Sequence, residues 1–310
     1  MKLGFLTACL PHLSLDTLAA WAAQEGFAAL EVAAWPRAES RGHTACHLDA
    51  DDFGPAQAAR VRELLAHHSL TLSAIGYYEN NLHGNPTRRA AIHGHLRACV
   101  DAAALLSVDC VGTFIGRDTS MTVADNLAEA KKVLPPLVDY AGERGVRLAI
   151  ENCPMPGWHP DGYPANLAYS PELWEWMFEL GLYLNFDPSH LVWLGIDPVV
   201  ALRDVLRCHV GRVVHVQAKD TQIDPPGRGQ HSIYGIALDR TDPWNTGWWR
   251  YRIPGRGDVD WQALVDSLYE HHYDGVISIE HEDPVWSGTE AKVKHGLEIG
   301  RGTLAAHVVE

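Results

Sequence analysis

The stretch LYLNFDPSH, residues 182–190, is an apolar run that stops on an aspartate, Asp187. A segment with helical spacing of its apolar residues, DPVVALRDVLRCH (197–209), follows it. After a glycine, a second apolar run begins, GRVVHVQAKD (211–220). A near-continuous apolar strand, a helix and a second such strand are typical of a parallel sheet that is covered by helices.

The same strand-and-helix unit recurs along the whole chain. Eight repeats in strict alternation favour closure into a (β/α)8 TIM barrel, and we expect one domain over residues 1–310. A doubly wound open sheet is the alternative, but no GxGxxG motif follows the first strand. The expected strands cover 2–8, 28–35, 70–78, 108–116, 146–152, 182–190, 211–220 and 275–283, and the expected helices cover 15–26, 55–68, 86–106, 121–145, 170–181, 197–209, 260–272 and 289–307.

Composition and charge argue against a nucleic-acid-binding protein and against a membrane-spanning one. The 310 residues carry a formal net charge of −14, which makes nucleic acid a poor partner because the phosphate backbone is repelled. No run of 18 apolar residues occurs, so no membrane span is indicated, and the N-terminus favours a first strand over a signal peptide. The six cysteines form no CxxC pair, which predicts reduced thiols in a cytoplasmic protein.

Two connections are too long for simple turns. Residues 152–169 follow the fifth strand and residues 221–258 follow the seventh, and both are rich in Gly, Pro, Trp and Tyr. Long connections on this side of a barrel form lids and binding loops, although an oligomer contact is an equal alternative for 221–258. Within it, IPGRGDVDW (253–261) predicts a tight structural turn, with Asp258 or Asp260 capping the next helix.

Four consecutive strands each carry one potential metal ligand near their C-terminal ends: Glu151, Asp187, His215 and Glu280. Each residue alone has an ordinary structural explanation, such as a solvated rim carboxylate, a turn-forming aspartate or a core histidine. In a closed parallel barrel these strand ends are neighbours on one rim, so we expect the four side chains to converge. Three carboxylates and an imidazole suit one divalent cation; Mn²⁺ fits best, with Mg²⁺, Co²⁺ and Zn²⁺ as alternatives.

These strand ends also carry a family resemblance. IEN (150–152), DPSH (187–190), HVQAKD (215–220) and SIEHED (278–283) resemble the sugar-phosphate isomerase/epimerase superfamily, the xylose isomerase-like TIM barrels. That superfamily includes ketose 3-epimerases, inosose isomerases and dehydratases, and abasic-site endonucleases. The resemblance implies that Glu151, Asp187, His215 and Glu280 are the metal ligands and that His190 contacts the substrate. Lys219 departs from the arginine that ketose epimerases place nearby.

The resemblance implies chemistry at a carbon next to a carbonyl. Glu151 and Glu280 would exchange the proton of a ketose or keto-sugar on opposite faces, through a metal-stabilised enediolate, with Lys219 stabilising the negative charge. The sequence therefore predicts a metal-dependent sugar isomerase or epimerase. The alternative is a lyase or dehydratase that acts on a 3-keto-glycoside or inosose, like the C-glycoside deglycosidase subunits, which work with a small β-sandwich partner.

Aromatic residues near the expected mouth of the barrel predict the size of the substrate. Trp35, Trp158 and the tryptophans at 244, 248 and 249 follow strands or lie in the two long segments, where they could stack on a sugar ring or aglycone. For any one of them, ordinary packing is the simpler explanation. We expect a small-molecule carbohydrate substrate and a homo-oligomer, and we expect neither a nuclease nor a non-catalytic sugar-binding barrel.

Overall fold

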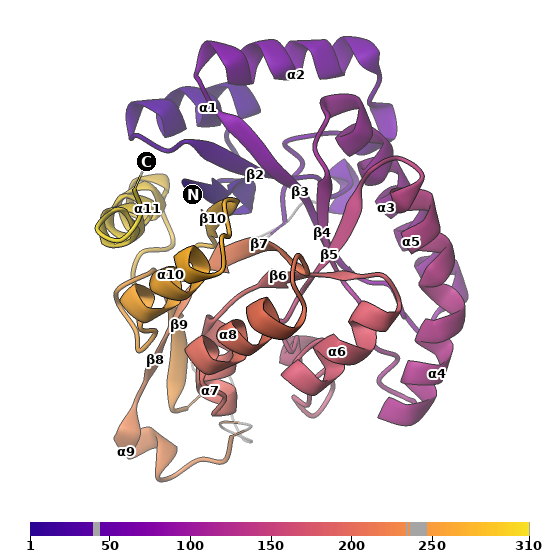
Figure 1. The fold of residues 1–310 in the computed structure, drawn as a ribbon, viewed down its shortest axis with the longest axis vertical. Helices are drawn as coiled ribbons and strands as arrows, with labels where there is room; N and C mark the ends of the chain where they lie inside the picture. The colour runs from indigo at the N-terminus through magenta and orange to yellow at the C-terminus, as the bar shows by residue number, and fades with distance from the viewer. Residues whose placement is uncertain (40–43, 234, 236–246, 310) are drawn as a thin grey trace.

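A closed barrel of eight parallel strands forms the centre of the computed structural model, which describes residues 1–39, 44–233, 235 and 247–309. Going round the barrel, the strands follow the order β1-β10-β7-β6-β5-β4-β3-β2, and helices surround them (Figure 1). This confirms the predicted (β/α)8 TIM barrel. The barrel strands are β1 (Lys2–Leu6), β2 (Ala29–Ala33), β3 (Thr71–Asn80), β4 (Cys110–Phe114), β5 (Arg147–Glu151), β6 (Tyr183–Phe186), β7 (Val213–Ala218) and β10 (Val276–Ile279).

The helices follow the predicted alternation, with one division. The expected helix over 121–145 is split at Pro135, because a proline is tolerated in the first turn of a helix and interrupts the interior of one. A short helix also begins at Ser189, so β6 ends earlier than the predicted strand. The helices are α1 (Leu15–Gln24), α2 (Pro55–His67), α3 (Pro86–Leu106), α4 (Val123–Val133), α5 (Pro135–Gly142), α6 (Pro171–Glu179), α7 (Ser189–Leu194), α8 (Pro198–Cys208), α10 (Trp261–Glu270) and α11 (Glu290–Ala305).

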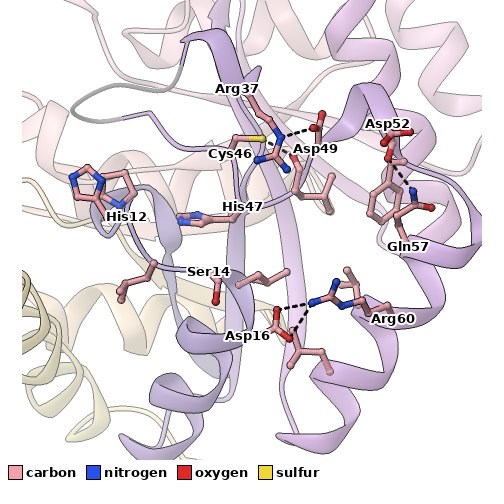
Figure 2. Close-up of a pocket in the computed structure, with 17 residues that line it drawn as sticks. His12, Ser14, Asp16, Arg37, Cys46, His47, Asp49, Asp52, Gln57 and Arg60 are labelled. Atoms are coloured by element: carbon pink, nitrogen blue, oxygen red, sulfur yellow. Dashed lines mark hydrogen bonds and ion pairs between the residues drawn. The ribbon is translucent and has the colours of Figure 1, made fainter.

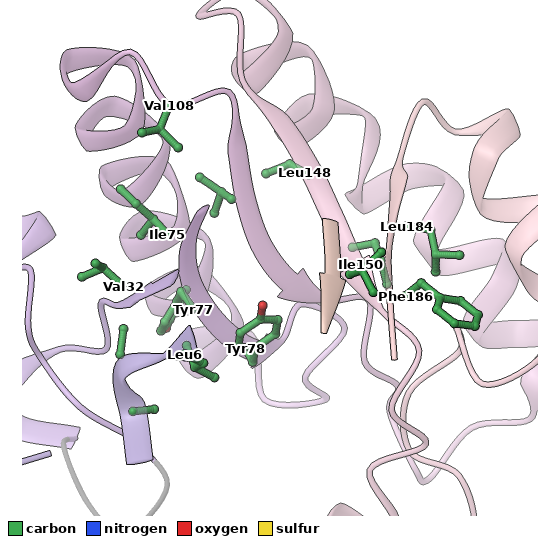
Figure 3. Packing of buried hydrophobic residues seen from close by; sticks show 14 of the residues in the cluster. Leu6, Val32, Ile75, Tyr77, Tyr78, Val108, Leu148, Ile150, Leu184 and Phe186 are labelled. Atoms are coloured by element: carbon green, nitrogen blue, oxygen red, sulfur yellow. The ribbon is translucent and has the colours of Figure 1, made fainter. Parts of the chain in front are cut away.

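Apolar strand residues form the core of the molecule. Ile75, Ile150, Leu184 and Phe186 are at most 1% exposed, and Figure 3 shows Ile150, Leu184 and Phe186 grouped beside one another. Because successive side chains of a strand point to opposite faces, the other positions of the same strands turn into the barrel. The outward-facing strand residues thus form an apolar layer under the helices. The inward-facing positions can carry side chains of another kind.

A polar network fills part of the barrel interior. The buried carboxylate of Glu31 accepts hydrogen bonds from Tyr78 Oη, from Ser278 Oγ at 2.8 Å and from Gln217 Nε2 at 3.2 Å. Asn185 Nδ2 donates to Tyr78 Oη at 3.0 Å. A buried carboxylate is tolerated only when donors satisfy it, and here three strands supply those donors. The network forms a floor beneath the C-terminal ends of the strands.

The segment after β7 contains regular structure that the sequence did not predict. β8 (Asp220–Ile223) and β9 (Trp249–Arg252) pair antiparallel, and the short helix α9 (Pro225–Arg228) lies between them in the chain (Figure 1). Trp244, one of the tryptophans considered above, falls outside the described residues.

The predicted turn within IPGRGDVDW packs on Asp220. The Asp220 carboxylate accepts from the backbone N–H groups of Gly255 and Val259 and from Trp261 Nε1, each at 3.0 Å. A side chain at Gly257 would collide with Asp220, so only glycine fits this approach. Asp260 caps α10 by accepting from Ala263 N at 2.9 Å, which confirms one of the two predicted caps and the structural interpretation of the turn.

The six cysteines are all free thiols in the structure. Of the described helices, none combines the length and the apolar character that crossing a bilayer requires.

Candidate metal and substrate site

Three of the four predicted ligands meet at the C-terminal rim of the barrel. Glu151 is the last residue of β5, Asp187 directly follows β6 and Glu280 directly follows β10. Each offers a carboxylate oxygen, and the three oxygens lie within 4.8 Å of one another. Glu151 and Asp187 are 2% and 0% exposed, so their charges are removed from bulk water. Three carboxyl groups this close together, two of them buried, stay ionised only if positive charges lie nearby.

Two asparagines fix the backbone of this rim. Asn152 donates to the Asp187 carbonyl at 2.8 Å and accepts from the Asp187 N–H at 2.7 Å, which ties the ends of β5 and β6 together. Asn166 donates to the carbonyls of Glu151 at 3.0 Å and Cys153 at 2.8 Å. These hydrogen bonds fix the backbone that carries the carboxylates, so the carboxylates are already positioned for binding.

The ammonium of Lys219 lies among the carboxylates. Its Nζ is 2.7 Å from Glu280 Oε2, 3.0 Å from Glu282 Oε2 and 3.3 Å from Asp187 Oδ2, and the residue is 1% exposed. Burial works to lower the pKa of Lys219, but the surrounding carboxylates outweigh it and hold the pKa well above its ordinary value. Burial, together with Glu151 and Glu282, raises the pKa of Glu280 despite Lys219.

His190, from α7, contacts two of the carboxylates. Its Nε2 lies 3.0 Å from Glu151 Oε1 and 3.2 Å from Asp187 Oδ2, while Nδ1 lies 2.8 Å from the hydroxyl of Tyr251 on β9. Burial alone would lower the pKa of His190, but the effects of Cys153, Tyr251 and Asp187 raise it above its ordinary value. The structure thus brings His190 and Lys219, both predicted substrate contacts, into the carboxylate group.

The fourth predicted ligand, His215, lies outside this group. Its Nδ1 is 3.0 Å from Asn185 Oδ1 and its Nε2 is 3.1 Å from Ser73 Oγ, so both ring nitrogens have protein partners. His215 and Lys219 face the same side of the strand, but four residues at a rise of ~3.3 Å each separate them along it. His215 therefore belongs to the polar floor, below the level of the three carboxylates.

Gln217 lies on β7 between His215 and Lys219, the residue that directly follows this strand, and it was not predicted as a site residue from the sequence. Its Nε2 donates to Glu31 and Tyr78, while Oε1 is buried and accepts no hydrogen bond from the described residues. The inward alternation of His215, Gln217 and Lys219 in HVQAKD was the available signal. An amide oxygen is also a ligand for hard cations.

The two predicted aromatic contacts lie in packed surroundings. Trp35 is 4% exposed, with its ring 6.2 Å from Tyr77 and 6.0 Å from Tyr78. Trp158 is half-buried and meets Phe114 edge-on, with ring centroids 5.4 Å apart. Their contact with a substrate stays a prediction.

Two further site residues were missed by the sequence analysis. Tyr251 contacts His190 through its hydroxyl, and its ring centroid is 4.7 Å from Lys219 Nζ. It lies 61 residues from His190, so no local pattern indicated the contact. Glu282 follows Glu280 by two positions, and that spacing in SIEHED could have indicated it.

The residues present fit a divalent cation. Oxygen ligands from three strand ends suit Mn²⁺ or Mg²⁺, and Asp187 Oδ2 is buried without accepting a hydrogen bond from the described residues. Lys219 and His190 neutralise part of the carboxylate charge, so a cation that binds here competes with the Lys219 ammonium for Asp187 and Glu280.

The opening beside Glu280 and Glu282 has a volume of about 20 Å³, which is room for about one water molecule. A cavity of about 550 Å³ lies elsewhere, between the connections that follow β1 and β2 and helices α1 and α2. Figure 2 shows charged side chains of this cavity paired, Arg37 with Asp49 and Arg60 with Asp16.

Comparison with known proteins gives a consistent picture of the fold. Residues 19–302 match the family model described as a xylose isomerase-like TIM barrel. The uncharacterised protein YfiH of Bacillus subtilis (strain 168) is 27% identical over 98% of this chain and 100% of its own length. The inosose dehydratase of Clostridium tetani (strain Massachusetts / E88) is 31% identical over 33% of this chain and 32% of its own length.

Two solved structures show the same fold at low sequence identity. The zinc-bound protein IolI superposes with a TM-score of 0.70 and 15% identity, covering 100% of both chains. A D-psicose 3-epimerase crystallised with D-fructose superposes with a TM-score of 0.65 and 16% identity, covering 98% of this chain and 99% of its own.

Proposed function

Because the chain belongs to the xylose isomerase-like TIM-barrel family, we propose that it is a divalent-metal-dependent enzyme that isomerises or epimerises a ketose or keto-sugar. The observation that carries the proposal is the meeting of Glu151, Asp187 and Glu280 at the rim, with the Lys219 ammonium between them. The epimerase among the solved structures and the inosose dehydratase among the relatives support a small carbohydrate as the substrate.

In this proposal the three carboxylates hold the ion, with Mn²⁺ the preferred metal. A divalent ion there would polarise a substrate carbonyl and acidify the neighbouring C–H bond. Glu151 and Glu280 stand on β5 and after β10, and the ends of β6 and β7 lie between them. A sugar carbon between the two carboxylates is exposed to one base on each face, as removal and return of a proton on opposite faces requires.

The two cationic side chains take the remaining roles. Lys219 lies within ion-pair distance of Glu280, so negative charge that develops on a substrate oxygen at this site would meet its ammonium. His190 is oriented by Tyr251 through Nδ1, which leaves Nε2 facing the carboxylates and a substrate hydroxyl. We expect Trp35 and Trp158 to contribute to the walls of the substrate site.

The alternative is a lyase or dehydratase that acts on an inosose or a 3-keto-glycoside, alone or with a small partner subunit. The relatives named inosose dehydratase favour it, although the similarity covers a third of each chain. The same proton abstraction begins both reactions, and loss of a β-substituent then replaces reprotonation. A general acid must protonate the leaving group, and Glu282, next to Lys219, is the candidate.

NMR in D₂O separates the two reactions. The metal-stripped protein is reloaded with Mn²⁺, Mg²⁺ or Co²⁺ and incubated with free ketoses, inososes and 3-keto-glucosides, and the reaction is quenched before the spectra are read. Metal-dependent deuterium uptake next to the carbonyl, with an epimer or isomer appearing, supports the isomerase. Elimination or release of an aglycone supports the alternative, a lyase or dehydratase.

Variants test the assigned roles. We expect Glu151→Gln and Glu280→Gln each to lower deuterium exchange by at least about 100-fold, the scale of a lost acid–base group. Glu270→Gln is the matched control, because Glu270 is an exposed residue at the C-terminal end of α10, the helix that leads into the start of β10. Exchange that survives in both rim variants would contradict the proposal.

The strand-7 ligand needs its own test, because the sequence predicts His215 and the buried unbonded oxygen of Gln217 offers an alternative. Mn²⁺ affinity is measured for His215→Ala and Gln217→Ala. A loss confined to the first variant supports His215, and a loss confined to the second supports Gln217.

A further inference from the structure

A second group of side chains with potential metal-ligand atoms adjoins the three carboxylates and shares Glu151 with them. Glu151, Cys153 and His190 are all buried, and each offers a ligand atom such that the three atoms lie within 4.8 Å of one another. We propose that this group is a thiolate-containing cation site that takes Zn²⁺ or Co²⁺. It rests on the proposed function in two residues, because it shares Glu151 with the carboxylate site and His190 with the proposed substrate contacts.

The chemistry of the donors distinguishes the two sites. Glu151, Asp187 and Glu280 offer oxygen alone, which suits hard cations, whereas a thiolate and an imidazole select Zn²⁺ and related borderline metals. Met155 Sδ lies 3.4 Å from Cys153 Sγ, which adds a thioether to the same side of Glu151. Cysteine sulfur, histidine nitrogen and glutamate oxygen are each zinc ligands, and a zinc site with three protein ligands keeps one position open.

The surroundings already orient these ligands. A metal-bound histidine normally makes a hydrogen bond through its other ring nitrogen, and His190 Nδ1 has Tyr251 Oη at 2.8 Å. Asn166 Nδ2 bonds the carbonyls of Glu151 and Cys153, so one side chain fixes two of the three ligand residues.

A further oxygen lies at the boundary of the two sites. Asp187 Oδ2 belongs to a fully buried residue and accepts no hydrogen bond from the described residues, but it lies 3.2 Å from His190 Nε2 and 3.3 Å from Lys219 Nζ. A cation bound beside His190 would therefore have this carboxylate oxygen within reach, in place of one of the two side-chain cations. When an ion binds, the Cys153 S–H bond breaks, the sulfur keeps the electron pair as a thiolate ligand, and the proton leaves to solvent.

Cobalt substitution tests the site without relying on activity. The full-length, metal-stripped protein is titrated with Co²⁺, and the thiolate-to-cobalt charge-transfer band in the near-ultraviolet is recorded together with proton release. We expect the band to saturate in the wild type and in Cys110→Ser, a matched buried cysteine on β4. We expect Cys153→Ser to lack the band; Cys153→Ala serves if the serine variant does not fold.

Two further variants separate this site from the carboxylate site. Glu280→Gln should weaken Mn²⁺ binding and keep the cobalt band, because Glu280 belongs to the carboxylate group alone. Tyr251→Phe should keep the band and weaken Co²⁺ binding by about tenfold, the effect expected when the hydrogen bond behind a histidine ligand is lost.

The outcomes are distinguishable. A wild-type protein that binds Co²⁺ without the band, or a band that persists in Cys153→Ser, overturns the thiolate site and leaves the carboxylate site standing. A band in a protein that fails to bind Mn²⁺ supports the thiolate site and removes the metal centre of the proposed function.

Discussion

The ammonium of Lys219 sits where three carboxylates converge, so it stabilises the metal-free protein. Lys219 pairs with Glu280 and Glu282 and has Asp187 at 3.3 Å. Each buried carboxylate that loses this partner must be stabilised in another way, by a proton or by a metal ion.

Replacing Lys219 with Met should therefore make stability depend on metal. Removing one partner of a buried ion pair costs about 3–5 kcal/mol, because the remaining charge is left uncompensated. We expect Lys219→Met to lose that amount in urea unfolding with EDTA present and to regain most of it with Mn²⁺. Lys132→Met, at an exposed pair with Glu129, should change stability by less than about 1 kcal/mol. A Lys219 variant that is as stable as the wild type in EDTA would contradict this account.

His47, which lines the cavity of Figure 2, should make the protein sensitive to acid. Burial lowers the pKa of His47 from 6.5 to about 4. Between these two values the unfolded chain binds a proton that the folded chain does not, so stability falls as the pH drops from 6.5 towards 4. One pKa unit corresponds to about 1.4 kcal/mol, so the contribution reaches about 3 kcal/mol.

Urea unfolding at pH 7, 5.5 and 4.5 measures this contribution. We expect His47→Gln to have a shallower loss of stability over that range than the wild type. The exposed His67→Gln is the matched control and should follow the wild type. Parallel curves for His47→Gln and the wild type would show that His47 is not responsible.

At the scale of elements, the β8–β9 hairpin packs against α7, the helix that carries His190. Trp249 on β9 stacks on Trp193 of α7, with ring centroids 4.6 Å apart and planes 5° from parallel. Thr221 Oγ1 donates to the Ser189 carbonyl at 2.7 Å, which attaches β8 to the same helix. Because α7 carries His190 and β9 carries Tyr251, a displacement of the hairpin would also change the position of His190.

Trp249→Ala should loosen the attachment of this hairpin to α7 without unfolding the barrel. Stacked aromatic pairs contribute about 0.5–1.5 kcal/mol beyond the area they bury, and here that energy holds one hairpin. We expect amide hydrogen exchange of Thr221–Ile223 and Trp249–Arg252 to become at least about fivefold faster, while exchange in β4 and β5 stays unchanged. Trp176→Ala on α6 is the control, and faster exchange throughout the barrel would contradict a local role for Trp249.

At the scale of the whole molecule, a bound metal should raise the free energy of unfolding. A ligand at 100 times its dissociation constant stabilises the folded state by about 2.7 kcal/mol if it binds only that state. We expect the melting temperature to rise with Mn²⁺ concentration in the wild type, to fall again with EDTA, and to respond much less in Glu280→Gln. Equal responses in both proteins would place the stabilising metal elsewhere. The predicted homo-oligomer and the single-domain organisation stay predictions at this scale.

The fold was largely predictable from local patterns. Each barrel strand is a short apolar run and each helix has its own spacing, so α3 was predicted at its observed bounds, 86–106. The strand ends that carry Glu151, Asp187 and Glu280 followed from the same alternation. Pro135 also indicated that the helix over 121–145 divides there, but this signal was missed because the helical spacing of apolar residues continues through it.

The position of each side chain along the barrel axis was harder to predict from the sequence. Alternation tells which face of β7 His215, Gln217 and Lys219 share, but not which of the three lies level with the carboxylates. That level depends on how β6, β7 and β10 are staggered, with Asn185 opposite His215 and Ser278 opposite Gln217. Stagger is a property of the closed barrel and of pairings between distant segments.

The sequence by itself determined an eight-fold alternation and a rim of carboxylates, because both arise from periodicity within short segments. The tertiary structure alone decided that the Lys219 ammonium forms an ion pair with Glu280, that His215 belongs to the floor beneath the carboxylates, and that Tyr251 contacts His190. The physical reason is that these contacts join residues 30 to 61 positions apart. Barrel closure and hairpin pairing bring them together, and no local propensity encodes such distances.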